Sequence, residues 1–238
     1  MRGKKKQIDS HQDAWSRRKW LNAAFSVATV LVVPGTALLP ARARAGQVEE
    51  PLAHSVSTAL SAAVSESPPL KPQFTEISER LAYLNWLGEM SNRLASRITN
   101  FDKRIEFLET VWYESKRAGL ETELVLGLIQ TESAFRQYAV SSAGAIGYMQ
   151  VMPFWTRLIG DGDVSKLFHA QTNLRYGCVI LRHYIDMEKG NLFMALGRYN
   201  GSRGRDHYPN TVFNFRSRWL YEPPAVPAVI AATAVAEE

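Results

Sequence analysis

The sequence predicts a mainly α-helical protein, and two observations support that prediction. Apolar residues recur at intervals of three and four in five segments between residues 74 and 219, which is the spacing of one helix face. No long stretch alternates apolar and polar residues as a half-buried strand would. The one Gly-rich stretch without a helical pattern in this region is 141–150, so we expect a loop there between helices.

The five helical patterns follow one another along the chain. They consist of Phe74, Ile77, Leu81, Leu84 and Leu87; Ile105, Leu108 and Trp112; Leu124, Val125, Leu128 and Ile129; Leu174, Cys178 and Leu181; and Val212, Phe215 and Trp219. Cys178 is the only cysteine, so no internal disulfide can form. Its apolar surroundings predict a buried structural thiol.

The chain opens with the features of an export signal. Residues 1–45 hold nine Lys and Arg against two Asp and Glu, and an apolar run at 23–39 leads to Ala43-Arg44-Ala45. The run at 16–21, Ser-Arg-Arg-Lys-Trp-Leu, resembles the twin-arginine export signal. We expect twin-arginine export to the periplasm and cleavage after Ala45, with general secretion and an uncleaved membrane anchor as the alternatives.

The remaining chain divides by composition. We expect a linker at 46–72, which ends in a proline-rich stretch, a helical extension at 73–103, a catalytic domain at 104–221 and a flexible Ala/Val/Pro tail at 222–238. Beyond residue 45 the chain holds 19 basic and 21 acidic residues. The positive charge therefore belongs to the leader, and no nucleic-acid-binding domain is expected.

Glu132 occupies an unusual position for a carboxylate. The segment 121–135 is an amphipathic helix, and Glu132 lies four residues after Leu128 and seven after Val125, on the apolar face. Burial raises the pKa of a carboxyl group, and a carboxyl protonated near neutral pH can donate a proton to a glycosidic oxygen. The alternative is a structural glutamate that is salt-bridged or exposed at the helix end.

Two further stretches carry polar groups suited to binding. The small residues of 141–150 let the backbone approach a bulky ligand, and the stretch ends at Gln150, whose amide can pair with an N-acetyl amide. Tyr199-Asn200-Gly201 follows a helical run, and Asn-Gly alone is an ordinary turn signal. The five histidines lack metal-binding spacing, so no metal site is expected.

Taken together, these motifs resemble the lytic transglycosylase domain of the soluble lytic transglycosylase type. The resemblance covers about residues 104–221, and its elements are Glu132-Ser133, the stretch 141–150 for the Gly-Leu-Met-Gln motif, Asn173 and Gly177, Tyr199-Asn200, and Tyr208 with Val212. The chain departs from the family pattern at Tyr148, where a leucine is usual, and at Arg198 and Gly201-Ser202 around the third motif.

The resemblance implies a lysozyme-like fold and a single acid/base, Glu132. Glu132 would protonate the bond between N-acetylmuramic acid and N-acetylglucosamine, the substrate's acetamido oxygen would stabilise the cation, and Glu132 would then deprotonate the C6 hydroxyl to close a 1,6-anhydro ring. The absence of Asp and Glu from residues 133–160 fits this chemistry. The implied substrate-binding residues are Ser141, Met149, Gln150, Tyr199 and Asn200, with Gln150 and Tyr199 also holding Glu132. No cofactor is implied.

Two other functions stay open at this point. One is a lysozyme-type hydrolase on the same scaffold, and the other is a non-catalytic peptidoglycan-binding or secretion-accessory protein. The expected partners are peptidoglycan glycan strands, with cell-envelope or secretion-system proteins as further candidates and no nucleic acid. A monomer is expected.

Overall fold

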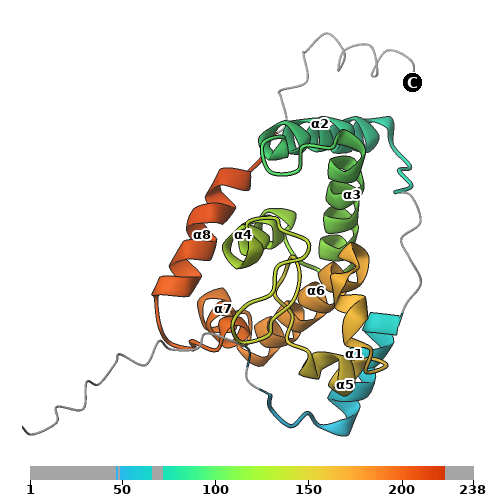
Figure 1. Cartoon of the computed structure of the whole chain (residues 1–238). Helices are drawn as coiled ribbons and strands as arrows, with labels where there is room; N and C mark the ends of the chain where they lie inside the picture. Colours follow the sequence, from blue (N-terminus) through green and yellow to red (C-terminus); the bar gives the residue numbers. More distant parts are fainter. Residues whose placement is uncertain (1–46, 48, 66–71, 223–238) are drawn as a thin grey trace, which may run out of the picture. The chain divides into compact units, whose positions relative to one another are not determined.

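The computed structural model describes residue 47 and the ranges 49–65 and 72–222, and Figure 1 shows an assembly of helices. The helices are α1 (His54–Ser65), α2 (Ile77–Leu94), α3 (Phe101–Arg117), α4 (Thr122–Ser133), α5 (Phe154–Ile159), the 3-10 helix η1 (Val164–Phe168), α6 (Ala170–Met187), α7 (Leu192–Asn200) and α8 (His207–Trp219). The mainly helical class is thus confirmed. The expected leader at 1–45 and nearly all of the expected tail lie outside the described residues.

The closest helix pair is α4 with α8 (Figure 1). Gly127 of α4 lies so near α8 that a Cβ atom there would sit 2.6 Å from the Arg216 backbone nitrogen. Trp219 at the end of α8 donates its indole N–H to Gln130 of α4 at 2.8 Å. A small residue and one side-chain hydrogen bond therefore fix the spacing of the two helices.

Helix α6 passes through the core. Leu174, Cys178 and Leu181 are fully buried there, and burial raises the pKa of the Cys178 thiol, as expected of an inert structural cysteine. Helix α6 also faces α3 through an ion pair in which Arg175 donates to the buried carboxylate of Glu114 at 2.9 and 3.0 Å. The pattern of apolar residues predicted that Leu174, Cys178 and Leu181 are buried. It did not predict the ion pair between Arg175 and Glu114.

The predicted face of α2 is wrong for three of its five residues, because Ile77, Leu81 and Leu84 are 79%, 54% and 48% exposed. Leu87 is buried and Phe74 is partly buried, as predicted. The helix buries the stripe Tyr83, Trp86, Leu87, Met90 and Leu94. Both stripes have helical spacing, so periodicity alone could not choose between them. The aromatic stripe is buried because Tyr83 packs against Phe74 and Trp112, with ring centroids 5.1 and 5.0 Å apart.

The expected linker at 46–72 also needs correction, because its middle part is the helix α1. This helix packs on α5 and α6. Ser57 donates to the Leu158 carbonyl at 2.8 Å, and Arg117 of α3 donates to the Ala63 carbonyl at 2.7 Å. The segment is mostly small and polar, so its helix depends on these contacts with the domain and leaves little trace in the sequence.

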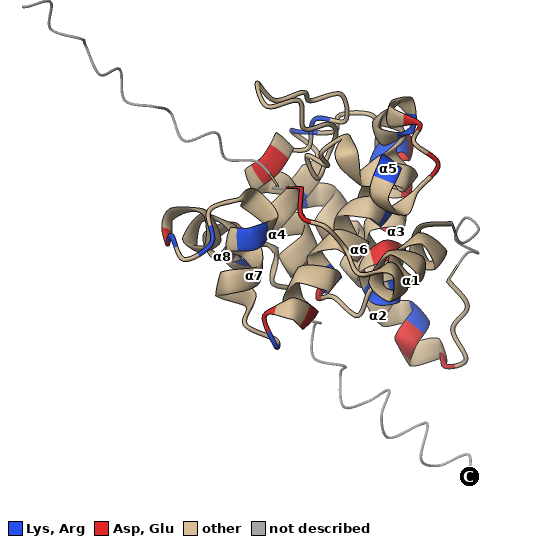
Figure 2. Ribbon diagram, turned by 90° about the horizontal axis from the view of Figure 1, so that it is seen from below, with Lys and Arg blue, Asp and Glu red and all other residues tan. Residues whose placement is uncertain are grey.

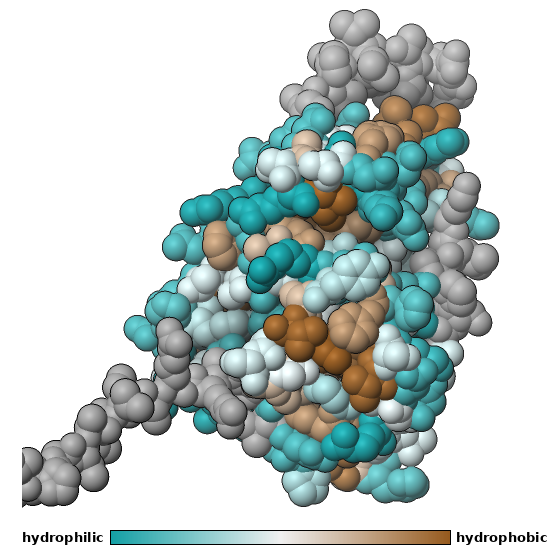
Figure 3. Space-filling model, viewed as in Figure 1, coloured by the Kyte–Doolittle hydropathy of each residue, from teal (hydrophilic) through white to brown (hydrophobic). Residues whose placement is uncertain are grey.

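Basic and acidic residues are interspersed along the described helices and loops, as Figure 2 shows. On the face seen in Figure 3, hydrophobic side chains gather in the middle, among polar ones. None of the described helices combines the length and the apolar character required to span a membrane.

Candidate active site

The candidate site begins at the end of α4. Glu132 is the next-to-last residue of this helix, and its side chain is partly buried. The chain leaves the helix through Ala134 and Phe135, which both adopt the left-handed conformation with φ of 50° and 64°. Such φ values are costly for residues other than glycine and persist only where packing enforces them. Phe135 supplies that packing, because it is buried against Phe107 and Trp219.

The stretch 139–151 forms the irregular loop expected from its glycines. Isolated bridges pair Ile146 with Val140 and with Val151. Asn173 of α6 is hydrogen-bonded to the loop. Its side chain accepts from the Met149 N–H at 2.8 Å and donates to the Ile146 carbonyl at 2.8 Å. Gly147 has a φ of +79°, and a Cβ there would collide with Asn173. The loop is therefore a rigid structure carried by α6.

An open cavity of about 640 Å³ lies where α4 and this loop meet. Glu132, Ser141 and Gln150 line it together, as the sequence predicts, and so do Arg97 and Tyr138, which the sequence analysis did not single out. Glu132 is the only carboxylate among the lining residues, all of which belong to the described chain. The site therefore offers one acid rather than a pair.

Burial raises the pKa of Glu132 from 4.5 to about 7, although a hydrogen bond from Tyr208 lowers it in part. The Tyr208 hydroxyl, from the first turn of α8, donates to the Glu132 carboxylate. Tyr208 is itself 8% exposed. A carboxyl with this pKa exists in both protonation states near neutral pH, as a group that first donates and then accepts a proton must.

Ser141 and Gln150 also brace the loop on which they lie. The Ser141 hydroxyl oxygen accepts from the backbone N–H groups of Ala143 and Ala145 at 3.3 and 3.0 Å. The Gln150 amide nitrogen donates to the carbonyls of Ala139 and Gly147 at 3.2 and 3.0 Å. Both side chains thus reach the cavity from fixed positions.

Three residues expected to bind substrate do not line this cavity. Met149 is fully buried, and Tyr199 is 1% exposed and donates its hydroxyl to the Met149 carbonyl at 2.8 Å. Asn200 ends α7. Met149 and Tyr199 therefore support the buried side of the loop. The resemblance implied that Gln150 and Tyr199 hold Glu132, whereas the hydrogen bond to its carboxylate comes from Tyr208.

Arg198, one of the departures from the family pattern, has a structural explanation. Its guanidinium pairs with Glu188 at the end of α6 and lies 3.4 Å from the Glu50 carboxylate. Arg203 pairs with the same Glu188 at 2.7 Å. Arg198 thus connects α7 to the end of α6 and does not line the cavity of Glu132. Among the described residues, no group of three or more His, Cys, Asp and Glu side chains could hold a metal ion.

The described domain is helical and presents one partly buried carboxyl group, Glu132, on an open cavity, as an enzyme that works through a single acid would. Residues 109–219 match the model of the family described as Transglycosylase SLT domain. This segment of the chain is therefore similar to that family, and its helical architecture agrees with the mainly helical fold that the resemblance implies.

Relatives with known names resemble the same region. The chain is 38% identical over 94 residues to membrane-bound lytic murein transglycosylase C of Actinobacillus pleuropneumoniae serotype 5b, a match covering 39% of this chain and 24% of that protein. It is 30% identical over 104 residues to the transglycosylase of Enterobacteria phage PRD1, covering 44% of this chain and 38% of that one. The chain thus spans well under half of these relatives.

A solved structure is also similar, that of an inactive mutant of lytic transglycosylase Slt from Pseudomonas aeruginosa. The match covers 59% of this chain and 29% of that one, with 23% identity and a TM-score of 0.44.

Proposed function

We propose that this protein is a peptidoglycan lytic transglycosylase that cleaves the bond between N-acetylmuramic acid and N-acetylglucosamine without water. The observation that carries the proposal is Glu132, a single carboxyl group with a pKa of about 7 on an open cavity whose lining holds no second acid. Most glycosidases need two carboxylates. The names of the relatives, lytic murein transglycosylase C and transglycosylase, support the same activity.

The proposed reaction runs through Glu132 twice. The protonated carboxyl donates its proton to the glycosidic oxygen, and the bond from that oxygen to C1 of the muramoyl unit breaks. The substrate's acetamido oxygen stabilises the cation at C1. The Glu132 carboxylate then removes the proton of the C6 hydroxyl, whose oxygen bonds to C1 and forms the 1,6-anhydro ring. No water is consumed, and Glu132 ends protonated.

The surrounding residues have separate proposed roles. Ser141 and Gln150 face the substrate, with Gln150 suited to an N-acetyl amide. Tyr138 is 72% exposed beside the cavity, and an exposed aromatic ring can pack on a sugar ring. Tyr208 orients Glu132. Met149, Tyr199 and Asn200 act on the shape of the loop that presents Gln150.

Mass spectrometry of the products tests the proposal. Purified protein acting on peptidoglycan should release muropeptides one water lighter than those that hydrolysis gives. Products with reducing ends as the main species would favour a lysozyme-type hydrolase instead. A chain that binds glycan strands without cutting them would favour the non-catalytic alternative.

The Glu132→Gln variant tests the residue assignment. We expect turnover to fall by at least about 10²- to 10⁴-fold, the usual worth of a general acid/base, while the fold and glycan binding persist. Glu123→Gln is the matched control, because Glu123 lies on the same helix and does not line the cavity. Full activity of Glu132→Gln would contradict the mechanism.

We also infer that the protein acts in the cell envelope, where peptidoglycan lies. The leader pattern supports this inference, as does the word "membrane-bound" in the name of the Actinobacillus relative. Replacing Arg17 and Arg18 by Lys keeps the charge and removes the guanidinium pair. We expect the precursor of that variant to accumulate in the cytoplasm, whereas normal processing would indicate general secretion.

A further inference from the structure

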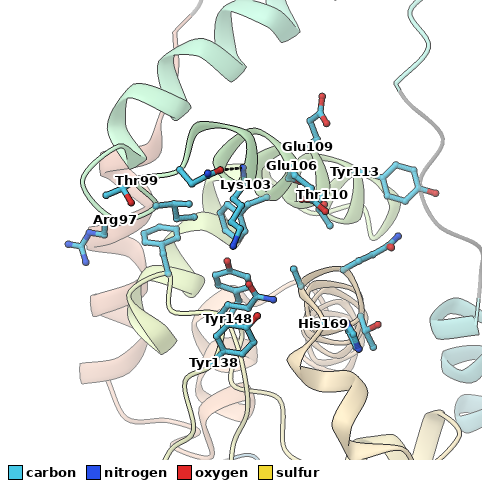
Figure 4. A pocket seen from close by; sticks show the side chains of 18 of the residues that line it. Arg97, Thr99, Lys103, Glu106, Glu109, Thr110, Tyr113, Tyr138, Tyr148 and His169 are labelled. Atoms are coloured by element: carbon cyan, nitrogen blue, oxygen red, sulfur yellow. Dashed lines mark hydrogen bonds between the residues drawn. The ribbon is translucent and has the colours of Figure 1, made fainter.

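A second, larger cavity adjoins the candidate active site. It has a volume of about 1010 Å³ and is drawn in Figure 4. Its lining shares Arg97, Phe135, Gln137 and Tyr138 with the cavity of Glu132, so the two cavities adjoin along these residues, and together they are called the cleft. A ligand that occupies the catalytic cavity can therefore extend directly into the larger one.

One wall of the larger cavity lies outside the match to the transglycosylase family. Residues 97–107, from the end of α2 to the middle of α3, contribute Arg97, Lys103 and Phe107 to the lining, whereas the family match begins at residue 109. The described part of the N-terminal extension is therefore a component of the cleft. Its side chains can therefore contact a substrate that occupies the cavity.

Two basic residues of this wall, Arg97 and Lys103, line the cavity, and Lys103 is the one that lies opposite Tyr148. Figure 4 shows its side chain reaching down from α3 toward Tyr148. The residue is exposed, and its ammonium group has no ion pair or hydrogen bond within the part of the chain that the structure describes. An unpaired ammonium group directed into a cavity of this size is available to an anionic group of a ligand.

Tyr148 forms the opposite side of this subsite. Its ring is buried against Phe107, with centroids 4.6 Å apart. Tyr148 also lines the cavity, and Figure 4 shows it facing Lys103. This residue stands where the resembled motif usually has a leucine, so this chain places a phenolic hydroxyl where an apolar side chain is usual.

Acidic side chains are present as well. Glu106 and Glu109 belong to the lining, and Figure 4 shows Glu109 directed away from the cavity. Burial raises the pKa of Tyr148 to about 12, and Tyr138 and Glu106 contribute less. The Tyr148 hydroxyl is therefore protonated at neutral pH and can donate a hydrogen bond to an anion.

We propose that Lys103 and Tyr148 form a subsite for a carboxylate carried by the muramoyl side chain of the glycan. This proposal rests on the proposed function and extends it. The muramoyl side chain is a lactyl group, which carries its own carboxylate on peptide-free strands and a peptide stem with several carboxylates on ordinary strands. Both sources present the same chemical group to Lys103. The volume of the cavity is ample for a stem.

Binding measurements test the subsite apart from catalysis. The full chain carrying Glu132→Gln is titrated with glycan fragments bearing peptide stems, with fragments stripped of peptide, and with chitooligosaccharides, which lack any carboxylate. Adding Lys103→Gln should weaken binding of carboxylate-bearing fragments by about 10-fold, the scale of a charge-assisted hydrogen bond, and leave chitooligosaccharide binding unchanged. Loss for stem-bearing fragments alone identifies the stem, and loss for stripped fragments alone identifies the lactyl group.

Matched variants define the outcome. Lys103→Arg should restore binding, Tyr148→Phe should weaken it less than Lys103→Gln, and Lys116→Gln should have no effect because Lys116 is exposed on the same helix and does not line the cleft. Equal loss for chitooligosaccharides, or no loss for any fragment, would overturn the proposal. A protein that binds as expected but releases no anhydro products would instead refute the proposed function and leave the subsite standing.

Discussion

At the scale of single residues, burial raises the pKa of Glu132 and Tyr208 lowers it in part. The Tyr208 hydroxyl donates to the carboxylate and so favours the charged form, against the larger effect of burial. The proposed first step needs protonated Glu132, so kcat/KM should fall as the pH rises through about 7. Two hydroxyl groups, those of Tyr208 and Tyr199, lie close to the site, but only the first bonds to Glu132.

The variant Tyr208→Phe should move this alkaline limb to higher pH, because the group that stabilises the carboxylate is lost. The pH dependence of kcat/KM measures the shift. Tyr199→Phe is the control, since that hydroxyl donates to the Met149 carbonyl, and its limb should stay in place. An unmoved limb in Tyr208→Phe would show that the tyrosine does not tune the acid.

Glu132 should also lower the free energy of unfolding at neutral pH. Its folded-state pKa of about 7 lies above the ordinary 4.5, so the folded protein binds more protons than the unfolded chain between these values. The unfolding free energy therefore falls as pH rises from about 4.5 to 7. We expect Glu132→Gln to be more stable than the unmodified protein at pH 8 by up to about 3 kcal/mol, and much less so at pH 4, in denaturant titrations. A difference that does not vary with pH would contradict the raised pKa.

The sequence predicted Glu132 because a carboxylate on an apolar helix face is conspicuous. It also predicted that Ser141 and Gln150 lie near Glu132, from the loop that carries them. It could not decide which tyrosine reaches Glu132, because that depends on the crossing of α4 and α8. Arg97, Tyr138 and Lys103 were missed, since exposed side chains carry no periodic signal.

At the scale of helices, the contact between α4 and α8 positions Glu132 against Tyr208. Gly127 permits this contact: a Cβ would lie 2.6 Å from the backbone nitrogen and 2.9 Å from the Cα atom of Arg216. Backbone atoms of a helix cannot rotate away as a side chain can. A larger residue at position 127 must therefore separate the helices.

We expect Gly127→Ala to lower the unfolding free energy by about 1–3 kcal/mol and to reduce activity as well, because the same displacement moves Tyr208. Gly88→Ala is the matched control. Gly88 is exposed within α2, and a Cβ there meets no atom within 4 Å, so alanine should stabilise by about 0.5–1 kcal/mol. Thermal unfolding and turnover of the two variants measure both effects. Unchanged stability and activity in Gly127→Ala would show that the helices can separate without cost.

The buried faces of helices were predicted best where the helix carries only one apolar stripe. α4, α6 and α8 carry a single apolar stripe, and their predicted core residues, from Leu124 to Trp219, are mostly buried. α2 carries two apolar stripes, and the sequence analysis chose a face that is mostly exposed. α1 carries only a weak stripe, and the sequence analysis predicted no helix there. For both helices, the surface that the helix packs against determines which face is buried and whether the helix forms. That surface comes from distant parts of the chain.

At the scale of the whole described chain, one buried carboxylate joins three helices. Glu114 of α3 is fully buried and accepts from Arg175 of α6 and from Arg117, whose guanidinium also donates to the Ala63 carbonyl of α1. The N-terminal segment is thus connected through Arg117 to the interior of the domain.

Removing this charge should destabilise the fold strongly. Glu114→Gln would leave Arg175 in a buried position without its carboxylate partner, and we expect a loss of about 3–5 kcal/mol in denaturant titrations. Glu89→Gln is the control, because the pair of Glu89 with Arg93 lies at the surface and should be worth at most about 1 kcal/mol. Similar small losses for both variants would mean that the buried network is dispensable.

The environment of Glu132 has a consequence for ionic strength. Burial and a neutral hydroxyl set its pKa, and no charged side chain of the described residues contributes. Dissolved salt screens charge–charge interactions and leaves desolvation largely unaltered. We therefore expect the alkaline limb of the pH profile to stay at the same pH from dilute buffer to high salt, while any substrate affinity that depends on Lys103 declines. A limb that moves with salt would reveal a charged neighbour. An acid tuned in this way would keep its strength in the variable ionic surroundings of the cell envelope.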